Sequence, residues 1–376
     1  TVQSEASLSS AIYLPNTVSL NQVFTVIMRV TNSGQAGANN VAPVLITNSA
    51  NVTVISTPSP ASINISASSA HDFTWTFSAT GTGTVNFSGR ASGTDANSGV
   101  VVYSGWSNKN VVVQTRPQLL MQLAVNPGTV SLNQLITVIM SVTNSGQADA
   151  LLVHPTPSDL GIISSGGGAA IKISGPTPLL ISIPGGQTRN FTWTYSATAS
   201  GQIQFSTVAM GTDANENTDV YSNTFTSSAI TIQQPAQLVS EISASNYVIS
   251  TGHIITVWMS VTNNGEASAN NVQPQLTASG TVSLISGPQP PATSVPGSSS
   301  AIFTWTYSVT GSGSLNFSGR AQGTDANSGW TVYSGYKSIT VNSQNAASLT
   351  SSIVSLPELA GIGWRITVVM TVTNTG

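Results

Sequence analysis

Oxygen-bearing side chains occupy every second position from residue 213 to residue 219, which is the spacing of a calcium-binding loop. The candidate metal ligands are Asp213, Asn215, Asn217 and Asp219. Calcium loops supply oxygen ligands in this alternating pattern and close with a bidentate glutamate at the twelfth position, where Thr224 stands here. The spacing predicts a partial calcium site and no other cofactor. The alternative is that the Asp and Asn side chains build a turn by hydrogen bonding to the backbone.

The same Gly-Thr-Asp-Ala-Asn turn occurs at residues 93–97, 211–215 and 323–327. The first and third copies shorten to Asp-Ala-Asn-Ser-Gly, so calcium is predicted first for the second copy. Three histidines, His71, His154 and His253, fall at unmatched positions, and no serine or carboxylate recurs beside them as a catalytic triad requires. We therefore predict no catalytic residue and no enzyme.

Asn-x-Ser/Thr sequons mark candidate glycosylation sites. They are Asn51, Asn64, Asn86, Asn190 and Asn316. In the alternating stretch Val85-Asn86-Phe87 the asparagine points away from the apolar face, so it could carry a sugar outside the core. Occupancy requires an extracellular protein in a host that glycosylates. Because Asn, Ser and Thr are abundant in this chain, the pattern also arises by chance.

A strand with the sequence VIMRVTNSG at residues 26–34 recurs at residues 138–146, 257–265 and 368–376. Its apolar residues alternate with period two, which predicts a core strand. One position on the outward face is apolar in every copy: Ile27, Ile139, Trp258 and Val369. A repeated outward apolar residue predicts an association surface along the molecule. The alternative is that a loop of the same domain covers it, since single apolar residues are common on surfaces.

Other local patterns predict how each repeat continues. Phe73–Phe77 alternates aromatic residues with threonine, and Val85–Ser88 follows a glycine-rich turn, so the two are expected to form a β-hairpin. The prolines Pro58 and Pro60, matched in the other repeats, predict a loop. In the second repeat, the glycine-rich stretch Ser164–Ala170 predicts a flexible surface insertion.

The spacing of the repeated strand gives the domain boundaries. Copies are 112, 119 and 111 residues apart, close to the length of one small sandwich domain. We expect immunoglobulin-like repeats at 1–115, 116–234 and 235–344, and the first strands of an incomplete fourth repeat at 345–376. About seven short strands per repeat and no helical pattern predict an all-β fold of tandem immunoglobulin-like β-sandwich domains, three full plus one partial. Short linkers, two of them containing proline, predict a rod.

Charge is nearly absent from the chain, and this limits its partners. Only 6% of the 376 residues are charged, and the net charge is −3. Nine Lys and Arg residues give no basic field, so no nucleic acid partner is expected. Weak mutual repulsion favours self-association into a polymer. The chain has no cysteine, no run of eighteen apolar residues, no signal peptide and no initial Met, so we expect a piece of a longer protein without a transmembrane segment.

The V-x-M-x-V-T-N-x-G strand is followed by Gln-Ala-Gly-Ala-Asn-Asn-Val in repeat 1 and by Glu-Ala-Ser-Ala-Asn-Asn-Val in repeat 3. Together they resemble the tandem immunoglobulin-like repeats of bacterial and archaeal cell-surface proteins, of the cell-adhesion-related and conserved-repeat types. The resemblance covers the whole chain. It implies a sandwich fold, an extracellular or cell-surface location and no enzyme.

These observations predict a structural extracellular protein that forms or extends a filament, sheath or surface layer. One alternative is a binding module, the stalk of a cell-surface adhesin, and another is a set of accessory repeats of a larger secreted enzyme. The partial fourth repeat adds an expectation about partners. A lone strand pair cannot bury an apolar face, so either the chain continues or another molecule supplies the missing strands by strand complementation.

Overall fold

The computed structural model describes residues 2–376, and every regular element in this part of the chain is a β-strand. The strands of repeat 1 are β1 (Leu8–Tyr13), β2 (Thr17–Ser19), β3 (Val23–Asn32), β4 (Ala38–Thr47), β5 (Val52–Ser59), β6 (Ile63–Ile65), β7 (Ser69–Ala79), β8 (Gly83–Asp95), β9 (Val101–Tyr103) and β10 (Ser107–Gln114). Those of repeat 2 are β11 (Leu119–Asn126), β12 (Thr129–Ser131), β13 (Leu135–Asn144), β14 (Ala150–Ser165), β15 (Ala169–Thr177), β16 (Ile181–Ile183), β17 (Thr188–Ala199), β18 (Gly201–Asp213), β19 (Asp219–Tyr221), β20 (Phe225–Thr226) and β21 (Ile230–Gln233).

Repeat 3 copies this order. Its strands are β22 (Leu238–Ala244), β23 (Val248–Ser250), β24 (Ile254–Asn263), β25 (Ala269–Ser279), β26 (Val282–Gln289), β27 (Thr293–Val295), β28 (Ser299–Val309), β29 (Gly313–Asp325), β30 (Thr331–Tyr333) and β31 (Lys337–Gln344). A hairpin of β32 (Leu349–Leu356) and β33 (Thr367–Asn374) follows. Each repeat has more strands than the seven expected, because very short ones such as β2, β6 and β9 add to the main set.

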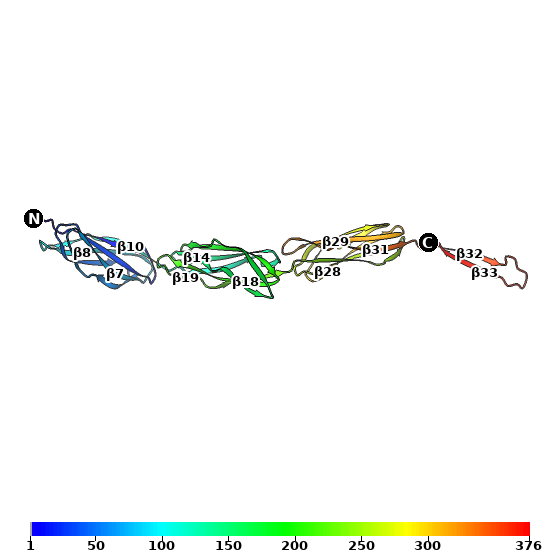
Figure 1. Ribbon diagram of the computed structural model, residues 1–376, viewed down its shortest axis with the longest axis horizontal. Helices are drawn as coiled ribbons and strands as arrows, with labels where there is room; N and C mark the ends of the chain where they lie inside the picture. Colours follow the sequence, from blue (N-terminus) through cyan, green and yellow to red (C-terminus); the bar gives the residue numbers. More distant parts are fainter. Residues whose placement is uncertain (1) are drawn as a thin grey trace.

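Each repeat is a sandwich of two sheets. In repeat 1 the order is β1-β3-β7-β5 in one sheet and β2-β10-β8-β4-β6 in the other, where β9 also pairs with β8; repeats 2 and 3 keep the same order. Figure 1 shows the three sandwiches end to end along the long axis, with the β32–β33 hairpin beyond the third. The prediction of three full immunoglobulin-like domains and one partial domain arranged as a rod is confirmed. Residues 2–376 contain no helix long and apolar enough to cross a membrane.

The repeated strand lies at the centre of each core, as its alternation predicts. In β3, the side chains of Val26, Met28 and Val30 are fully buried, and the matching residues of β13 and β24 are buried too. The strand is hydrogen-bonded on both sides, to β1 and to β7. Because both neighbours in the sheet pair along most of its length, this strand fixes the register of its sheet.

The predicted hairpin between the aromatic strand and the next strand is wrong. The two strands are β7 and β8, and they lie in opposite sheets. Phe77 and Phe87 meet edge to face across the sandwich, with ring centroids 5.0 Å apart. A strand, a glycine-rich turn and a strand look the same in sequence whether the turn stays in one sheet or crosses to the other. Here both strands bury one face, so packing those faces against each other determines the crossing.

The loops predicted from proline pairs are also wrong in part. Pro58, Pro176 and Pro288 lie inside β5, β15 and β26, near the end of each strand. These strands are at the edge of their sheets and contain register shifts. Proline has no N–H to donate, so an edge strand tolerates it where a central strand does not.

The predicted flexible insertion in repeat 2 is mostly strand. Residues up to Ser165 belong to β14, whose last residues pair with β18, and β15 begins at Ala169. Gly166 and Gly167 form the turn with φ of 63° and 83°. Positive φ is readily available to glycine, so these glycines make a tight turn between two extended strands.

The end of the repeated strand is a buried hydrogen-bonded turn. The Asn144 side chain is fully buried; its Oδ1 accepts from Gly146 N at 3.0 Å, and its Nδ2 donates to Ala148 O at 2.8 Å and to Ile183 O at 3.1 Å. A Cβ on Gly146 would overlap the carbonyl oxygen of Arg116, which crosses this turn. The Asn-x-Gly sequence is therefore required because one residue must satisfy a buried turn and the next must let the chain cross.

We expect Asn144→Asp to destabilise repeat 2 by about 3 kcal/mol or more, because it places an oxygen against two buried carbonyl oxygens. Urea unfolding of the chain measures the change. Ser145→Ala is the matched control, at the exposed next position, and we expect it to change stability by less than about 0.5 kcal/mol. Equal stability of the two variants would contradict the role given to Asn144.

Candidate functional site

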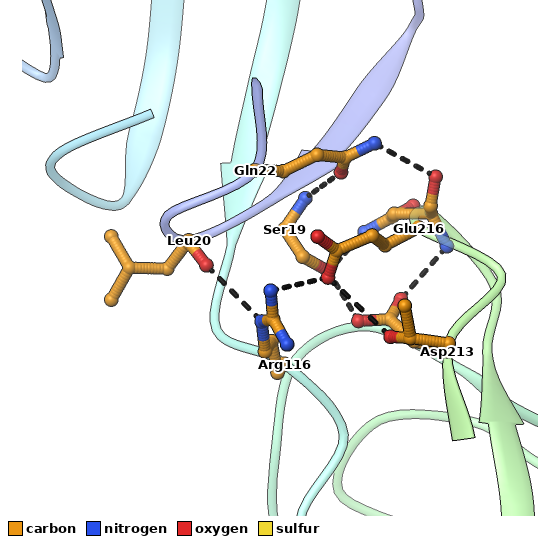
Figure 2. Close-up of polar contacts among 8 residues, drawn as sticks. Ser19, Leu20, Gln22, Arg116, Asp213 and Glu216 are labelled. Carbon is orange, nitrogen blue, oxygen red and sulfur yellow. Dashed lines mark hydrogen bonds and ion pairs between the residues drawn. The ribbon is translucent and has the colours of Figure 1, made fainter. Parts of the chain in front are cut away.

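The Asp-Ala-Asn turn of repeat 2 lies against the end of repeat 1. Figure 2 shows Ser19, Leu20 and Gln22 of repeat 1 facing Asp213 and Glu216 of repeat 2, with Arg116 of the linker between them. The turn comes directly after β18, and the residues it meets lie at the end of β2 and just beyond it. The predicted chemical motif is therefore part of a contact between domains.

Side chains of the two repeats make a hydrogen-bonded junction there. Ser19 Oγ donates to Asp213 Oδ2 at 2.7 Å, and Asn215 Nδ2 donates to Ser19 Oγ at 3.2 Å. The same Asn215 Nδ2 donates to Gln114 Oε1 at 3.0 Å. Gln22 Nε2 donates to the carbonyl oxygen of Asn215 at 3.0 Å. The turn thus contacts repeat 1 at two places, the segment at the end of β2 and the end of β10.

The junction between repeats 2 and 3 is built in the same way. Ser131 Oγ donates to Asp325 Oδ1 at 2.9 Å, and Asn327 Nδ2 donates to Ser131 Oγ at 3.3 Å. Asn327 Nδ2 also donates to Gln233 Oε1 at 2.8 Å. Gln134 Nε2 donates to the carbonyl oxygen of Asn327 at 3.2 Å. We call this set of a Ser, two Gln, an Asp and an Asn the interdomain lock.

Linker side chains add to the first lock. Arg116 forms an ion pair with Glu216, and its Nε donates to Leu20 O at 3.3 Å. The backbone N of Thr115 donates to Gln147 Oε1 at 3.0 Å. At the second junction the backbone N of Gln234 donates to Glu266 Oε2 at 2.8 Å. Each linker is therefore hydrogen-bonded to the repeat that comes after it, and the first also to the repeat before it.

The carboxylates of the three turns are buried, and hydrogen bonds lower the pKa of two of them, Asp95 and Asp325. Asp95, Asp213 and Asp325 are at most 1% exposed. The backbone N of Ser98 and of Ala6 donate to Asp95 and lower the pKa of its carboxyl to about 2. For Asp325, burial raises the pKa, but bonds from Ser328, Ala236 and Ser131 outweigh it, so that the pKa is lowered. A buried carboxylate with this many donors forms a rigid turn.

The hydrogen bonds of the repeat 1 turn are all made within repeat 1. Asp95 accepts from Ala6 N at 2.7 Å and from Ser98 N at 2.7 Å, and Asn97 Nδ2 donates to Gln3 Oε1 at 3.0 Å. In all three copies the Asp accepts the backbone N of the Asn two residues on. The turn-building alternative is therefore observed, and the lock is added to it.

The four candidate calcium ligands are close in sequence, but two of them already make hydrogen bonds across the domain junction. Asp213 and Asn215 are in the lock, Asn217 has a positive φ of 58°, and Asp219 begins β19. Residues 2–376 hold no group of three or more His, Cys, Asp or Glu side chains that could bind a metal ion. This set has two carboxylates and two amides, so calcium binding stays a prediction, and it would compete with the lock for the Asp213 oxygens.

The other candidate residues are spread along the rod. The sequons Asn64, Asn190 and Asn316 are exposed, and Asn51 and Asn86 are half-buried. On the outward face of the repeated strand Ile27, Ile139 and Trp258 are half-buried, whereas Val369 is 46% exposed. Glycosylation and association through these residues stay predictions. The three histidines lie in three different places, His71 on β7, His154 on β14 and His253 before β24, so the fold does not bring them together.

Sequence reasoning misses the residues that receive the turn. Thr-Val-Ser-Leu-Asn-Gln occurs at 17–22 and again at 129–134, which is a repeat as clear as the Asp turn itself. Repeat 3 has Ser250 and His253 at the positions of Ser19 and Gln22. Internal repetition could have marked the segment, but nothing local says that it contacts a turn about 194 residues further on.

Comparison with known proteins gives only distant likenesses. No protein-family model and no curated protein matches the chain. Among solved structures, the adhesin FdeC of Escherichia coli is 12% identical over 92% of this chain and 99% of that one, with a TM-score of 0.35. The adhesin InvE of Yersinia pseudotuberculosis is 11% identical over 61% and 60%, with a TM-score of 0.22. Alpha-2-macroglobulin of Escherichia coli is 12% identical over 95% and 24%, with a TM-score of 0.26. Likenesses this weak say nothing about what the chain binds.

Repeat 1 should lose stability in acid because of Asp95. Its carboxyl has a pKa of about 2 when folded and an ordinary value of 3.8, so the unfolded chain binds more protons between these values. The stabilisation is therefore complete above the unfolded pKa and is lost as the pH falls from about 4 towards 2. Thermal unfolding at stepped pH measures this. Asp95→Asn is the control, and we expect its stability to vary less over the same range; an equal loss would contradict the assignment.

Ser131→Ala should loosen the second junction without unfolding either domain. It removes the hydroxyl that bridges Asp325 and Asn327, at a cost of about 1 kcal/mol, while Asp325 keeps its internal donors. Because the chain has no cysteine, one cysteine can be introduced into each of repeats 2 and 3 for labelling. We expect a broader distribution of label distances. Ser250→Ala changes the matching residue of repeat 3 and is the control. An unchanged distribution in Ser131→Ala would rule out the lock.

Proposed function

We propose that the chain is a structural extracellular protein whose locked repeats form or extend a surface filament, sheath or surface layer. The observation that supports this most is the interdomain lock, built from the same residue types at both junctions. Each lock joins domains whose linker is only a few residues long. Domains joined by a short linker and several hydrogen bonds reorient less relative to each other than freely linked domains do.

The surface of the rod also suits assembly. Charged residues are 6% of the chain, so copies repel one another weakly. Exposed apolar residues recur in every repeat at one position of the edge strands β5, β15 and β26: Ile55, Ile173 and Ile285 are 57%, 55% and 54% exposed. With the half-buried Ile27, Ile139 and Trp258, they are the surface through which we propose that copies associate.

The β32–β33 hairpin is the second place where we propose association. Its register matches that of β1 and β3, but Val368, Met370 and Val372 are 54–58% exposed. The matching residues Val26 and Met28 are fully buried. To be buried as in repeat 1, this face needs a strand equivalent to β7 beside it and the strands of an opposite sheet over it. A longer form of the same chain or a second molecule, by strand complementation, would supply them.

A rigid rod would also serve as the stalk of a cell-surface adhesin, since a stalk has to hold a binding domain away from the surface. This second candidate differs from the filament in the kind of domain that accompanies the repeats. A domain in the full-length gene that is not an immunoglobulin-like repeat would favour the stalk. Further repeats of the same kind would favour the filament.

The filament is tested by electron microscopy of the native material and by light scattering of the purified chain. We expect polymers in the native material and a concentration-dependent rise in mass in solution. A double variant, Ser19→Ala with Ser131→Ala, should give bent or shorter polymers, because each rod then flexes at both junctions. Ser250→Ala is the control and should give straight ones. Dispersed monomers at high concentration would contradict the proposed filament but would not contradict the interdomain lock.

A further inference from the structure

A cationic side chain lies between two exposed aromatic rings in repeats 1 and 3. In repeat 1 the Arg90 guanidinium carbon is 5.1 Å from the Tyr103 ring centroid and 5.0 Å from that of Trp106. Arg320 in repeat 3 is 4.3 Å from the Tyr333 centroid and 5.0 Å from that of Tyr336. These are cation–π distances, and we call each set an Arg–aromatic clamp.

The clamps are open to solvent although their framework is fixed. Tyr103 and Trp106 are 57% and 48% exposed, and Tyr333 and Tyr336 are 47% and 66% exposed. Ser104, between the two aromatic residues of repeat 1, is buried, and its Oγ accepts from Ala91 N at 2.8 Å. Ser334 does the same for Ala321 N in repeat 3 at 2.7 Å. Each anchored segment therefore presents two aromatic faces beside a guanidinium of β8 or β29. The Nε of Arg320 donates to Gln275 Oε1 at 3.2 Å, which leaves its terminal N–H groups for a ligand.

Each clamp shares a strand face with a sequon. On β8, Asn86 and Arg90 are four residues apart and both alternate with buried residues, so their side chains are on the same outward face. At about 3.3 Å per residue they are about 13 Å apart. On β29, Asn316 and Arg320 have the same arrangement. A short sugar chain attached to either asparagine could reach the clamp.

Repeat 2 lacks both features at once. On β18, Gln204 stands where the other repeats have the sequon asparagine, and Val208 stands in place of the arginine. Thr224 replaces the second aromatic residue, while Tyr221 keeps the first. The sequon at this strand position and the clamp are thus present together in repeats 1 and 3, and repeat 2 lacks both.

We propose that each Arg–aromatic clamp binds carbohydrate, and that its ligand is the glycan attached to the sequon on the same strand, Asn86 for Arg90 and Asn316 for Arg320. Sugars have C–H faces that pack on aromatic rings and hydroxyl groups that accept hydrogen bonds from a guanidinium. The glycan then lies flat along the outward face of the large sheet. The inference goes beyond the proposed rod and depends only on its extracellular location.

The test uses the full chain purified from its natural host. Glycopeptide mass spectrometry should find sugar on Asn86 and Asn316. In NMR spectra of the glycoprotein, ring currents should shift sugar protons upfield relative to the same glycan on protease-released peptides. Trp106→Ala should remove the shift for the glycan on Asn86 only, and Tyr336→Ala for the glycan on Asn316 only. Tyr221→Ala in repeat 2 is the matched control and should remove neither.

Three results would overturn the proposal. The first is the absence of sugar from both Asn86 and Asn316, even if a free oligosaccharide binds the clamps of unglycosylated protein, because the ligand would then come from another source. The second is an upfield shift that survives in Trp106→Ala and Tyr336→Ala. The third is a loss of self-association in these variants with the sugar signals unchanged, since Trp, Tyr and Arg also concentrate in protein interfaces. None of these results affects the interdomain lock.

Discussion

The rod depends on one buried carboxylate at each domain junction. Asp95, Asp213 and Asp325 end the long strand of the large sheet, and each is almost inaccessible to water. A buried carboxylate is costly unless donors surround it, and part of the required set comes from its own turn. In Asp213 and Asp325 the neighbouring domain adds a serine hydroxyl. The same carboxylate therefore ends a domain and contacts the domain that precedes it.

The lock explains why the facing domain ends are polar: apart from its carboxylates and Arg116, hydroxyl and amide side chains make the contacts. Apolar domain ends would also hold neighbouring repeats together. They would, however, leave an exposed apolar surface wherever a repeat has no neighbour, and they would not fix how one repeat is rotated relative to the next about the rod axis. Hydrogen bonds are directional, and a Ser and two Gln of one repeat must meet the Asp and Asn of the turn in the next repeat at the same time. The low charge of the chain fits this design, because amides and hydroxyls supply direction without long-range repulsion.

Alternation of apolar and polar residues predicts most of the strands, but it says little about which strands pair and which domains contact each other. The repeated strand and the aromatic strand are recognisable because burial of one face imposes alternation, which Val26, Met28 and Trp75 follow. The partner of each strand is not encoded locally, which is why the hairpin expected from β7 and β8 is wrong. The Asp turn is recognisable as a motif, but its sequence indicates only metal binding or turn building, because Ser19 lies 194 residues away from Asp213.

Differences among the repeats show how the lock tolerates change. Ala6 N and Ala236 N donate to the carboxylates of repeats 1 and 3, but Pro117 takes this place in repeat 2 and has no N–H. Glu216 also replaces the serine whose hydroxyl donates to Asp95 and Asp325. Asp213 thus depends more on Ser19 of the preceding repeat. Arg116 compensates, because it pairs with Glu216 and holds Leu20 O. The turn of repeat 2 has fewer hydrogen-bond donors of its own, and the linker adds a cation beside it. The contact between the domains is therefore kept with a different set of side chains.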